Sequence, residues 1–213
     1  MVEIVLTLIA VLAGLLTVLI KWKRPTLVGR RGERIVSRKL FELNPEKYTT
    51  LNNLLVVSQG SVGTTQIDHV VVSSFGIFVI ETKNHAGWIF GNAYQRHWTQ
   101  VIYRYKKKFF NPLRQNYGHI RAIEQLVRPH YSHIPIVGFV TFPSAERLQI
   151  TGSNSVGHVV DVIRMIHVYT KPVVSDSDRT NICNLLVAAN IQDKKTIKEH
   201  NKKTHALRVS TGL

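Results

Sequence analysis

Two strand-like runs joined by a very short turn place the tightest constraint on how this chain folds. The runs Gln66–Ser73 and Ile77–Thr82 are rich in Val, Ile and Phe, and the turn between them contains Ser74 and Phe75. β-Branched and aromatic residues favour strands, and two such runs with a short connection predict a β-hairpin. The chain therefore contains an antiparallel strand pair.

The register of this hairpin brings two acidic residues together. A loop of two residues or of four pairs Ser73 with Gly76 in either case, which places Asp68 opposite Glu81 on one face. Lys83 projects from the same face. Opposed carboxylates destabilise a sheet unless a cation compensates, and Mg²⁺ would do so better than Lys83 alone. An ordinary salt-bridge cluster on an exposed strand face is the alternative, and the spacing favours neither.

The rest of the chain alternates between strand-like and helix-like segments. Turn residues bound further strand-like runs at Tyr48–Val57, Trp88–Tyr94 and Trp98–Tyr105. The apolar run Ile134–Phe142 is typical of a buried central strand. Helices are predicted at Gly29–Leu43, from Asn111-Pro112 to about Val127, at Asp161–Tyr169 and at Asp178–Ala189. This order predicts an α/β fold in which helices flank a mixed β-sheet.

The N-terminal segment has the composition of a transmembrane helix. Residues Ile4–Ile20 carry no charge and are long enough to cross a hydrocarbon layer of about 30 Å. Glu3 precedes this run and the basic segment Lys21–Arg24 follows it, which is the reverse of a signal peptide. The positive-inside rule then places the soluble part in the cytoplasm. A buried core helix is the alternative, but the run lacks a polar stripe.

We therefore divide the chain into four segments. They are a membrane anchor with a basic stop (1–24), the core of the soluble domain (25–145), a C-terminal helical part of the same domain (146–193) and a flexible basic tail (194–213).

Charge and residue types narrow the classes of function. The 28 Lys and Arg residues outnumber the 13 acidic residues, for a net charge of +15. This excess favours polyanions such as nucleic acid or anionic lipid, although a soluble basic protein would share it. The single cysteine, Cys183, excludes an intramolecular disulfide and cysteine-pair zinc sites. The sequence contains no glycine-rich phosphate loop, the motif that would indicate a nucleotide-triphosphate enzyme.

An ordered series of motifs resembles the nuclease-related domain, or NERD, family, which is similar to the PD-(D/E)xK nucleases. The series consists of Gly29–Glu33, Gln66–Val70, Gly76–Asn84, Gly87–Gly91 and Asn111–Asn116. The resemblance covers roughly residues 29–142 and implies a restriction-endonuclease-like core. The superfamily's proline before the first aspartate is absent, because Ile67 precedes Asp68.

The resemblance implies roles for residues at the matching positions. It implies that Asp68 and Glu81 bind Mg²⁺ or Mn²⁺ with the Thr82 carbonyl as a further ligand, and that Lys83 is the catalytic lysine. Glu33 would support the metal or its water, although an acid in the first turn of a helix also interacts favourably with the helix dipole. Gln115 would face the site, although an amide near the Asn111 cap needs no such role.

The candidates for nucleic-acid contact are basic. Arg104, Lys106, Lys107 and Lys108 form a run with an interposed tyrosine, which suits phosphate binding but also a solvated hairpin tip. His85 follows Lys83 closely and is either a phosphate contact or a plain loop residue. The aromatic residues at strand spacing are predicted to pack in the core or on a sheet face: Trp88, Tyr94 and Trp98.

These observations predict a membrane-anchored, metal-dependent nuclease that hydrolyses DNA phosphodiesters. The alternative is a non-catalytic module that holds nucleic acid or a partner protein at the membrane. A third possibility is that the basic surface binds lipid and strengthens the anchor.

Overall fold

The computed structural model describes residues 27–59 and 62–210. The predicted transmembrane segment, residues 1–24, lies outside them. No helix within the described ranges combines the length and apolar character needed to cross a membrane.

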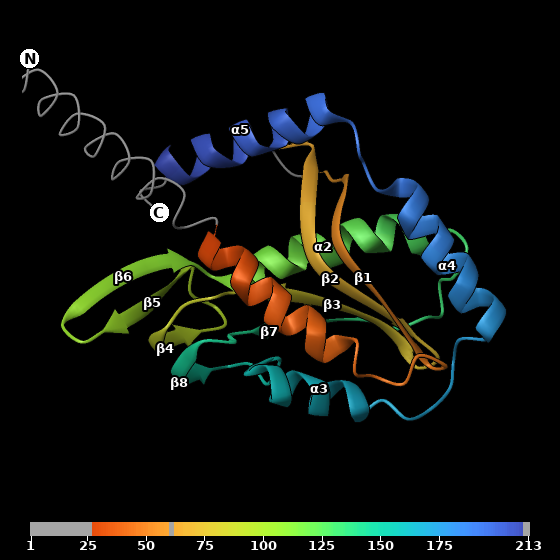
Figure 1. The fold of residues 1–213 in the computed structure, drawn as a ribbon, viewed down its shortest axis with the longest axis horizontal. Helices are drawn as coiled ribbons and strands as arrows, with labels where there is room; N and C mark the ends of the chain where they lie inside the picture. The colour runs from red at the N-terminus through yellow and green to blue at the C-terminus, as the bar shows by residue number, and fades with distance from the viewer. Residues whose placement is uncertain (1–26, 60–61, 211–213) are drawn as a thin grey trace, which may run out of the picture.

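A five-stranded mixed sheet forms the centre of the molecule (Figure 1). Its strand order is β1-β2-β3-β7-β9. The first three strands form an antiparallel meander, whereas β7 pairs in parallel with β3 and β9 pairs in parallel with β7. The bounds are β1 Tyr48–Val57, β2 Thr64–Ser73, β3 Gly76–Thr82, β7 Ile136–Thr141 and β9 Val156–Gly157.

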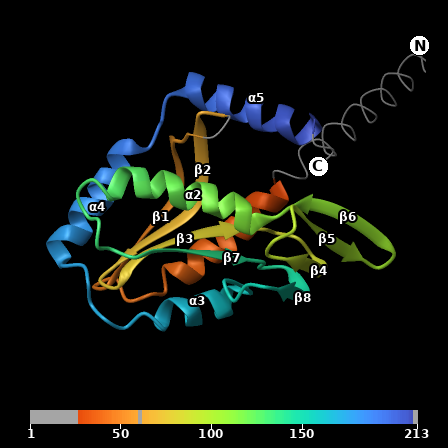
Figure 2. The ribbon, with the colours of Figure 1, turned by 180° about the vertical axis from the view of Figure 1, so that it is seen from behind.

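Helices cover both faces of this sheet. The helix over residues 27–40 crosses its front in Figure 1, and α2 crosses the back that faces the viewer in Figure 2. Apolar side chains of α2 and α4 pack on one face, and those of helix 27–40 and α3 pack on the other. The bounds are α2 Pro112–Val127, α3 Val159–His167, α4 Asp176–Ala189 and α5 Lys194–Ser210. The predicted α/β class with a mixed, helix-flanked sheet is confirmed.

A second, four-stranded sheet of order β6-β5-β4-β8 lies beside the first. Its inner face shares a small core with β7, to which Ile89, Trp98 and Phe142 contribute. The strands are β4 Gly87–Asn92, β5 His97–Ile102, β6 Tyr105–Phe110 and β8 Ala145–Thr151.

The predicted hairpin register is confirmed. Ser73 pairs with Gly76, and the ladder continues to His69 and Ile80. The Ser73 hydroxyl stabilises the turn, since it donates to the Gly76 carbonyl at 2.8 Å and accepts from the Phe75 amide at 3.1 Å. Gly76 has a φ of 141°, and a Cβ there would lie 2.9 Å from the Pro135 carbonyl oxygen. Glycine is therefore required where the chain turns into β3.

Three segments differ from the prediction. Residues 194–210, expected as a flexible tail, form helix α5, and its buried His200 bonds Thr64 at 2.9 Å. Its sequence is polar on all sides, so no apolar stripe indicated a helix. Residues 146–157, assigned to a helical part, contribute most of β8 and all of β9. The basic run of residues 106–108, expected as a phosphate patch or a solvated hairpin tip, lies within β6. This is an edge strand of the second sheet, and lysines are well tolerated on edge strands.

Candidate active site

Asp68 and Glu81 lie on the face of the hairpin that α2 covers. Alternation places them in phase with Val70 and Val79, whose side chains pack in the core beneath α2. The ladder ends one residue pair before them, and Asp68 Oδ2 accepts the Thr82 backbone N–H at 2.8 Å instead. The Asp68 carboxylate thus replaces a strand-to-strand hydrogen bond.

Glu81 is the centre of the cluster. Its carboxylate is 1% exposed, and Oε1 lies 2.6 Å from Lys83 Nζ. The other oxygen, Oε2, lies 2.9 Å from His119 Nε2. Lys83 Nζ also donates to Gln115 Oε1 at 2.8 Å. These contacts therefore join three of the residues predicted for the site, Glu81, Lys83 and Gln115, and add His119.

Helix α2 is fixed so that Gln115 and His119 face this cluster. Asn111 caps it by accepting the Leu113 N–H at 2.9 Å and donates to the Gln95 carbonyl at 2.7 Å. One turn on, buried Asn116 donates to carbonyls of both β3 and β7. Residues four apart lie on one face of a helix, so Gln115 and His119 reach the site together.

The two carboxyl groups have opposite pKa shifts. Burial, followed by the nearby Glu81 carboxylate, raises the pKa of Asp68 well above its usual range. Burial also acts to raise the pKa of Glu81, but Lys83 and His119 outweigh it and lower this pKa to about 2. Lys83 and His119 therefore hold Glu81 ionised, while Asp68 has a strong tendency to keep its proton. A second nearby cation would release that proton.

The donor set suits a hard divalent cation. Mg²⁺ in enzymes is often held by only one or two carboxylates, with waters and substrate phosphates completing its shell. Asp68 and Glu81 supply two carboxylates, and their mutual repulsion is the interaction that such a cation relieves. No group of three or more His, Cys, Asp and Glu side chains suited to a metal occurs in the described part of the chain. A metal here would accordingly depend on water and substrate for its other ligands.

Glu33 approaches the cluster from the opposite helical layer. The glycine at residue 32 allows this close approach, because a Cβ at that position would clash with Asn84 Cβ at 2.5 Å. Asn84 in turn donates to the Val28 carbonyl at 2.5 Å. Burial, followed by the charge of Glu81, raises the pKa of Glu33, with Arg30 and Lys83 opposing. The structure thus places Glu33 within electrostatic reach of the site.

A chain of hydrogen bonds links Thr82 to helix 27–40, the helix that carries Glu33. The Thr82 hydroxyl lies 3.1 Å from His69 Nε2, and His69 Nδ1 lies 2.7 Å from Asn52 Oδ1. Asn52 then donates to the Ser37 hydroxyl at 3.1 Å. Burial lowers the pKa of His69 to about 4, although Glu81 acts to raise it. Neutral His69 therefore accepts the Thr82 hydroxyl proton and donates to Asn52.

The basic candidates are distributed differently from the acidic ones. His85 packs its ring on Phe109, with centroids 4.5 Å apart. Its burial, followed by Lys83 and Lys107, lowers the pKa of His85 to about 4, so the ring is neutral at pH 7. Arg104 lies in the turn between β5 and β6, and the hairpin extends away from the central sheet (Figure 1). Lys106 and Lys108 are exposed on β6.

Sequence reasoning missed His119 and its partner Thr65. His119 Nδ1 lies 2.8 Å from the Thr65 hydroxyl, so β2 fixes the ring that contacts Glu81. The available signal was the four-residue spacing from Gln115, which places both side chains on one helix face.

Comparisons with known proteins identify the family of this chain. The model of the nuclease-related domain (NERD) family matches residues 28–143, a span that contains every residue of the cluster. An uncharacterized protein of Bacillus anthracis (pXO1-01) is 38% identical over 203 residues, which cover 94% of each chain. No solved structure gives a significant match. The chain belongs to the nuclease-related domain family.

Proposed function

We propose that this protein is a metal-dependent nuclease with a restriction-endonuclease-like core, which hydrolyses DNA phosphodiester bonds at Asp68, Glu81 and Lys83. The observation that carries the proposal is the buried Glu81 carboxylate, which lies 2.6 Å from the Lys83 ammonium. Glu81 is on β3, the strand next to the one that carries Asp68. Two carboxylates and a lysine in this arrangement suit hydrolysis of a phosphodiester.

Asp68 and Glu81 would hold Mg²⁺ or Mn²⁺, with the Thr82 carbonyl as a further ligand. The metal would act as a Lewis acid on a phosphate oxygen. Lys83 remains partly exposed at 21%, so its ammonium is able to meet a substrate while Gln115 and Glu81 orient it. Lys83 would neutralise charge that develops on the phosphate, and Glu33 would orient water nearby.

His119 would act as a positioning residue. It donates to one oxygen of Glu81 and is itself fixed by Thr65. Such a partner orients a ligating carboxylate.

The membrane anchor belongs to the same proposal. The uncharged run of residues 4–20 and the cations after it support a single-pass helix with the nuclease domain in the cytoplasm.

A non-catalytic module that tethers nucleic acid or a partner protein is the second candidate. It is favoured by the hydrogen bonds of Glu81, whose two oxygens both have protein partners. If Lys83 and His119 satisfy Glu81 without a metal, the domain would act through its positive charge alone.

A cleavage assay separates the two candidates. The full chain in detergent is incubated with plasmid and linear DNA in Mg²⁺ or Mn²⁺, beside Lys83→Ala and an EDTA control. Lys171→Ala, at an exposed lysine, serves as the matched charge control. Cleavage that survives only in the native chain and Lys171→Ala supports the nuclease. DNA binding without cleavage, equal in all variants, supports the tethering module.

A further inference from the structure

The second sheet has an outer face that the active site does not use. Side chains alternate between the two faces of a strand. On β4 and β5 the residues that point inward include Ile89 and Trp98, each at most 1% exposed. The residues that alternate with these along each strand, among them Trp88 and Phe90, must therefore point outward.

The strand register arranges these outward residues in two rows across the sheet. The first row runs Lys106, Val101, Trp88 and Arg147. The second row runs Lys108, Thr99, Phe90 and Gln149. We call these two rows the outer face. Because the rows are two residues apart along each strand, they lie about 7 Å from one another.

The outer face combines aromatic rings on β4 with cations on β6 and β8 at either side. Trp88 is 44% exposed, and its ring centroid lies 6.3 Å from that of Phe90. The Arg147 guanidinium lies 5.1 Å from the Trp88 centroid. Lys106, Lys108 and Arg147 are all exposed. The one acidic residue on these strands, Glu146, falls at the register shift between β4 and β8 and lies outside both rows.

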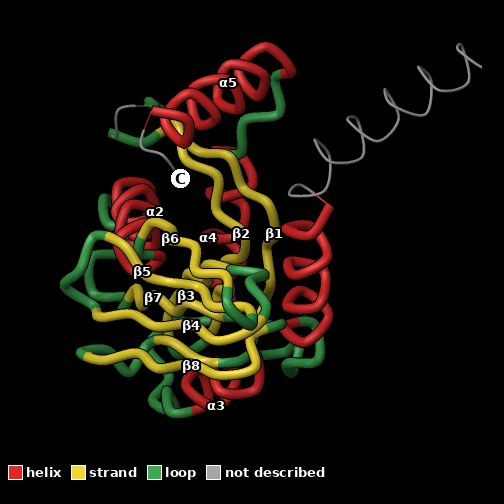
Figure 3. The backbone as a smooth tube through the Cα atoms, turned by 90° about the vertical axis from the view of Figure 1, so that its left-hand side faces the viewer, coloured by secondary structure: helices red, strands yellow, loops and turns green. Residues whose placement is uncertain are grey.

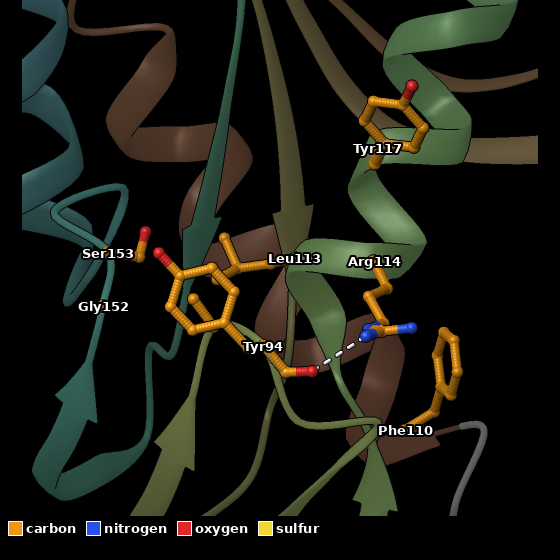
Figure 4. A pocket seen from close by; sticks show the side chains of 8 residues that line it. Tyr94, Phe110, Leu113, Arg114, Tyr117, Gly152 and Ser153 are labelled. Atoms are coloured by element: carbon orange, nitrogen blue, oxygen red, sulfur yellow. Dashed lines mark hydrogen bonds between the residues drawn. The ribbon is translucent and has the colours of Figure 1, made fainter.

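The outer face is open and continues into a pocket. No helix of the described chain crosses the front of this sheet in Figure 3. Phe110, in phase with Lys108 on β6, also lines a pocket of about 440 Å³ together with Tyr94, Arg114 and Tyr117. In Figure 4 the Arg114 guanidinium reaches the Tyr94 carbonyl, a hydrogen bond of 2.8 Å. The pocket thus extends the same mixture of rings and cations beyond the sheet.

We propose that the outer face binds single-stranded nucleic acid, with bases stacked on Trp88 and Phe90 and phosphates paired with Lys106, Lys108 and Arg147. It deepens the proposed function, on which it rests, by naming the form of nucleic acid that the domain takes. Exposed rings flanked by cations are the arrangement that single-strand binders use. Duplex bases are already stacked on one another, so a duplex would contact the cations but leave the rings unused.

Binding is measured without cleavage, so that the result does not depend on catalysis. The full chain in detergent is titrated in EDTA against a fluorescent oligothymidylate and, separately, against a duplex of equal length. Trp88→Ala should weaken oligothymidylate binding about tenfold and change duplex binding less than twofold. Trp88→Phe should retain most of the affinity, because a ring remains.

Matched controls test whether the face itself is responsible. Phe41→Ala removes a ring that is 64% exposed elsewhere and should have no effect. Lys106→Gln with Lys108→Gln should flatten the salt dependence of oligothymidylate binding, whereas Lys171→Gln should not. Because every titration is made in EDTA, a failed nuclease assay would leave this proposal standing.

Any of three results would overturn the proposal. The first is oligothymidylate affinity that changes less than twofold in Trp88→Ala while the variant keeps the native circular dichroism spectrum. The second is a duplex affinity as high as that of the oligothymidylate. The third is tight binding to anionic vesicles that the oligothymidylate fails to displace.

Discussion

His119 on α2 lies 2.9 Å from Glu81 Oε2, on the opposite side of the carboxylate from Lys83. Hydrogen-bond donors from two separate parts of the chain thus meet at one buried carboxylate, which fixes its orientation. Because Thr65 on β2 holds the other ring nitrogen of His119, the strand that carries Asp68 also orients Glu81.

Removal of His119 should weaken metal binding more than the chemistry itself. In His119→Ala the Glu81 carboxylate loses the donor that orients it, and loss of such a partner costs about 10- to 100-fold in metal affinity. The Mg²⁺ concentration for half-maximal cleavage should rise by this factor, with the maximal rate largely restored at high Mg²⁺. His130→Ala, at an exposed position near the end of α2, should match the native protein. A maximal rate that stays low at saturating Mg²⁺ would contradict this role.

Lys83 should also be required for stability. Lys83→Met leaves the Glu81 carboxylate, which is 1% exposed, without its nearest cation. Breaking a buried ion pair costs about 3 kcal/mol in the free energy of unfolding. The double variant with Glu81→Gln should recover part of that loss, because no charge then remains unpaired. Urea unfolding measures both values, and a double variant less stable than Lys83→Met would refute the interpretation.

Gly32 should tolerate no side chain, unlike the helical glycine in α2. A Cβ at Gly32 would lie 2.5 Å from Asn84 Cβ, whereas one at Gly118 would meet nothing within 4 Å. Gly32→Ala should therefore cost about 1–3 kcal/mol and displace helix 27–40. Gly118→Ala should leave stability unchanged or raise it by up to about 1 kcal/mol. Thermal unfolding distinguishes them, and equal midpoints would be inconsistent with this close approach.

Stability should fall in mild acid because of His85. Its folded-state pKa is about 4, against an unperturbed 6.5, so the unfolded chain binds its proton first. The stability from neutral His85 is therefore complete above pH 6.5 and is lost as the pH falls toward 4. Between pH 7 and 4.5, His85→Phe should lose about 2 kcal/mol less than the native chain. Parallel stability curves for the two proteins would exclude this contribution.

Local patterns predicted the hairpin and its register, because a buried face and a short turn permit only one alignment. That register accordingly predicts Asp68, Glu81 and Lys83 on one face, whereas Gln115 is predicted at the site only by the family resemblance. His119 was not predicted, since its contact with Glu81 depends on how α2 docks on β3 and β7, and no local pattern encodes that docking.

The second sheet also shows that local sequence patterns do not encode how elements pack together. Trp88, Tyr94 and Trp98 were all predicted to pack in the core or on a sheet face, yet Trp98 is buried while Tyr94 is largely exposed. Lys107 alternates with the outward-pointing Lys106 and Lys108, although all three lysines are exposed. Strand spacing predicts that neighbouring residues face opposite sides, but only the packed sheets decide which side is buried.

The most direct test of the site is the binding of Mn²⁺ to the full chain, followed by the electron paramagnetic resonance signal of the free ion. The account predicts one tight site in the native protein that both Asp68→Asn and Glu81→Gln abolish, while Lys171→Ala retains it. Mn²⁺ binding that is absent from the native protein, or unchanged in both carboxylate variants, would contradict a metal-dependent active site at Asp68 and Glu81.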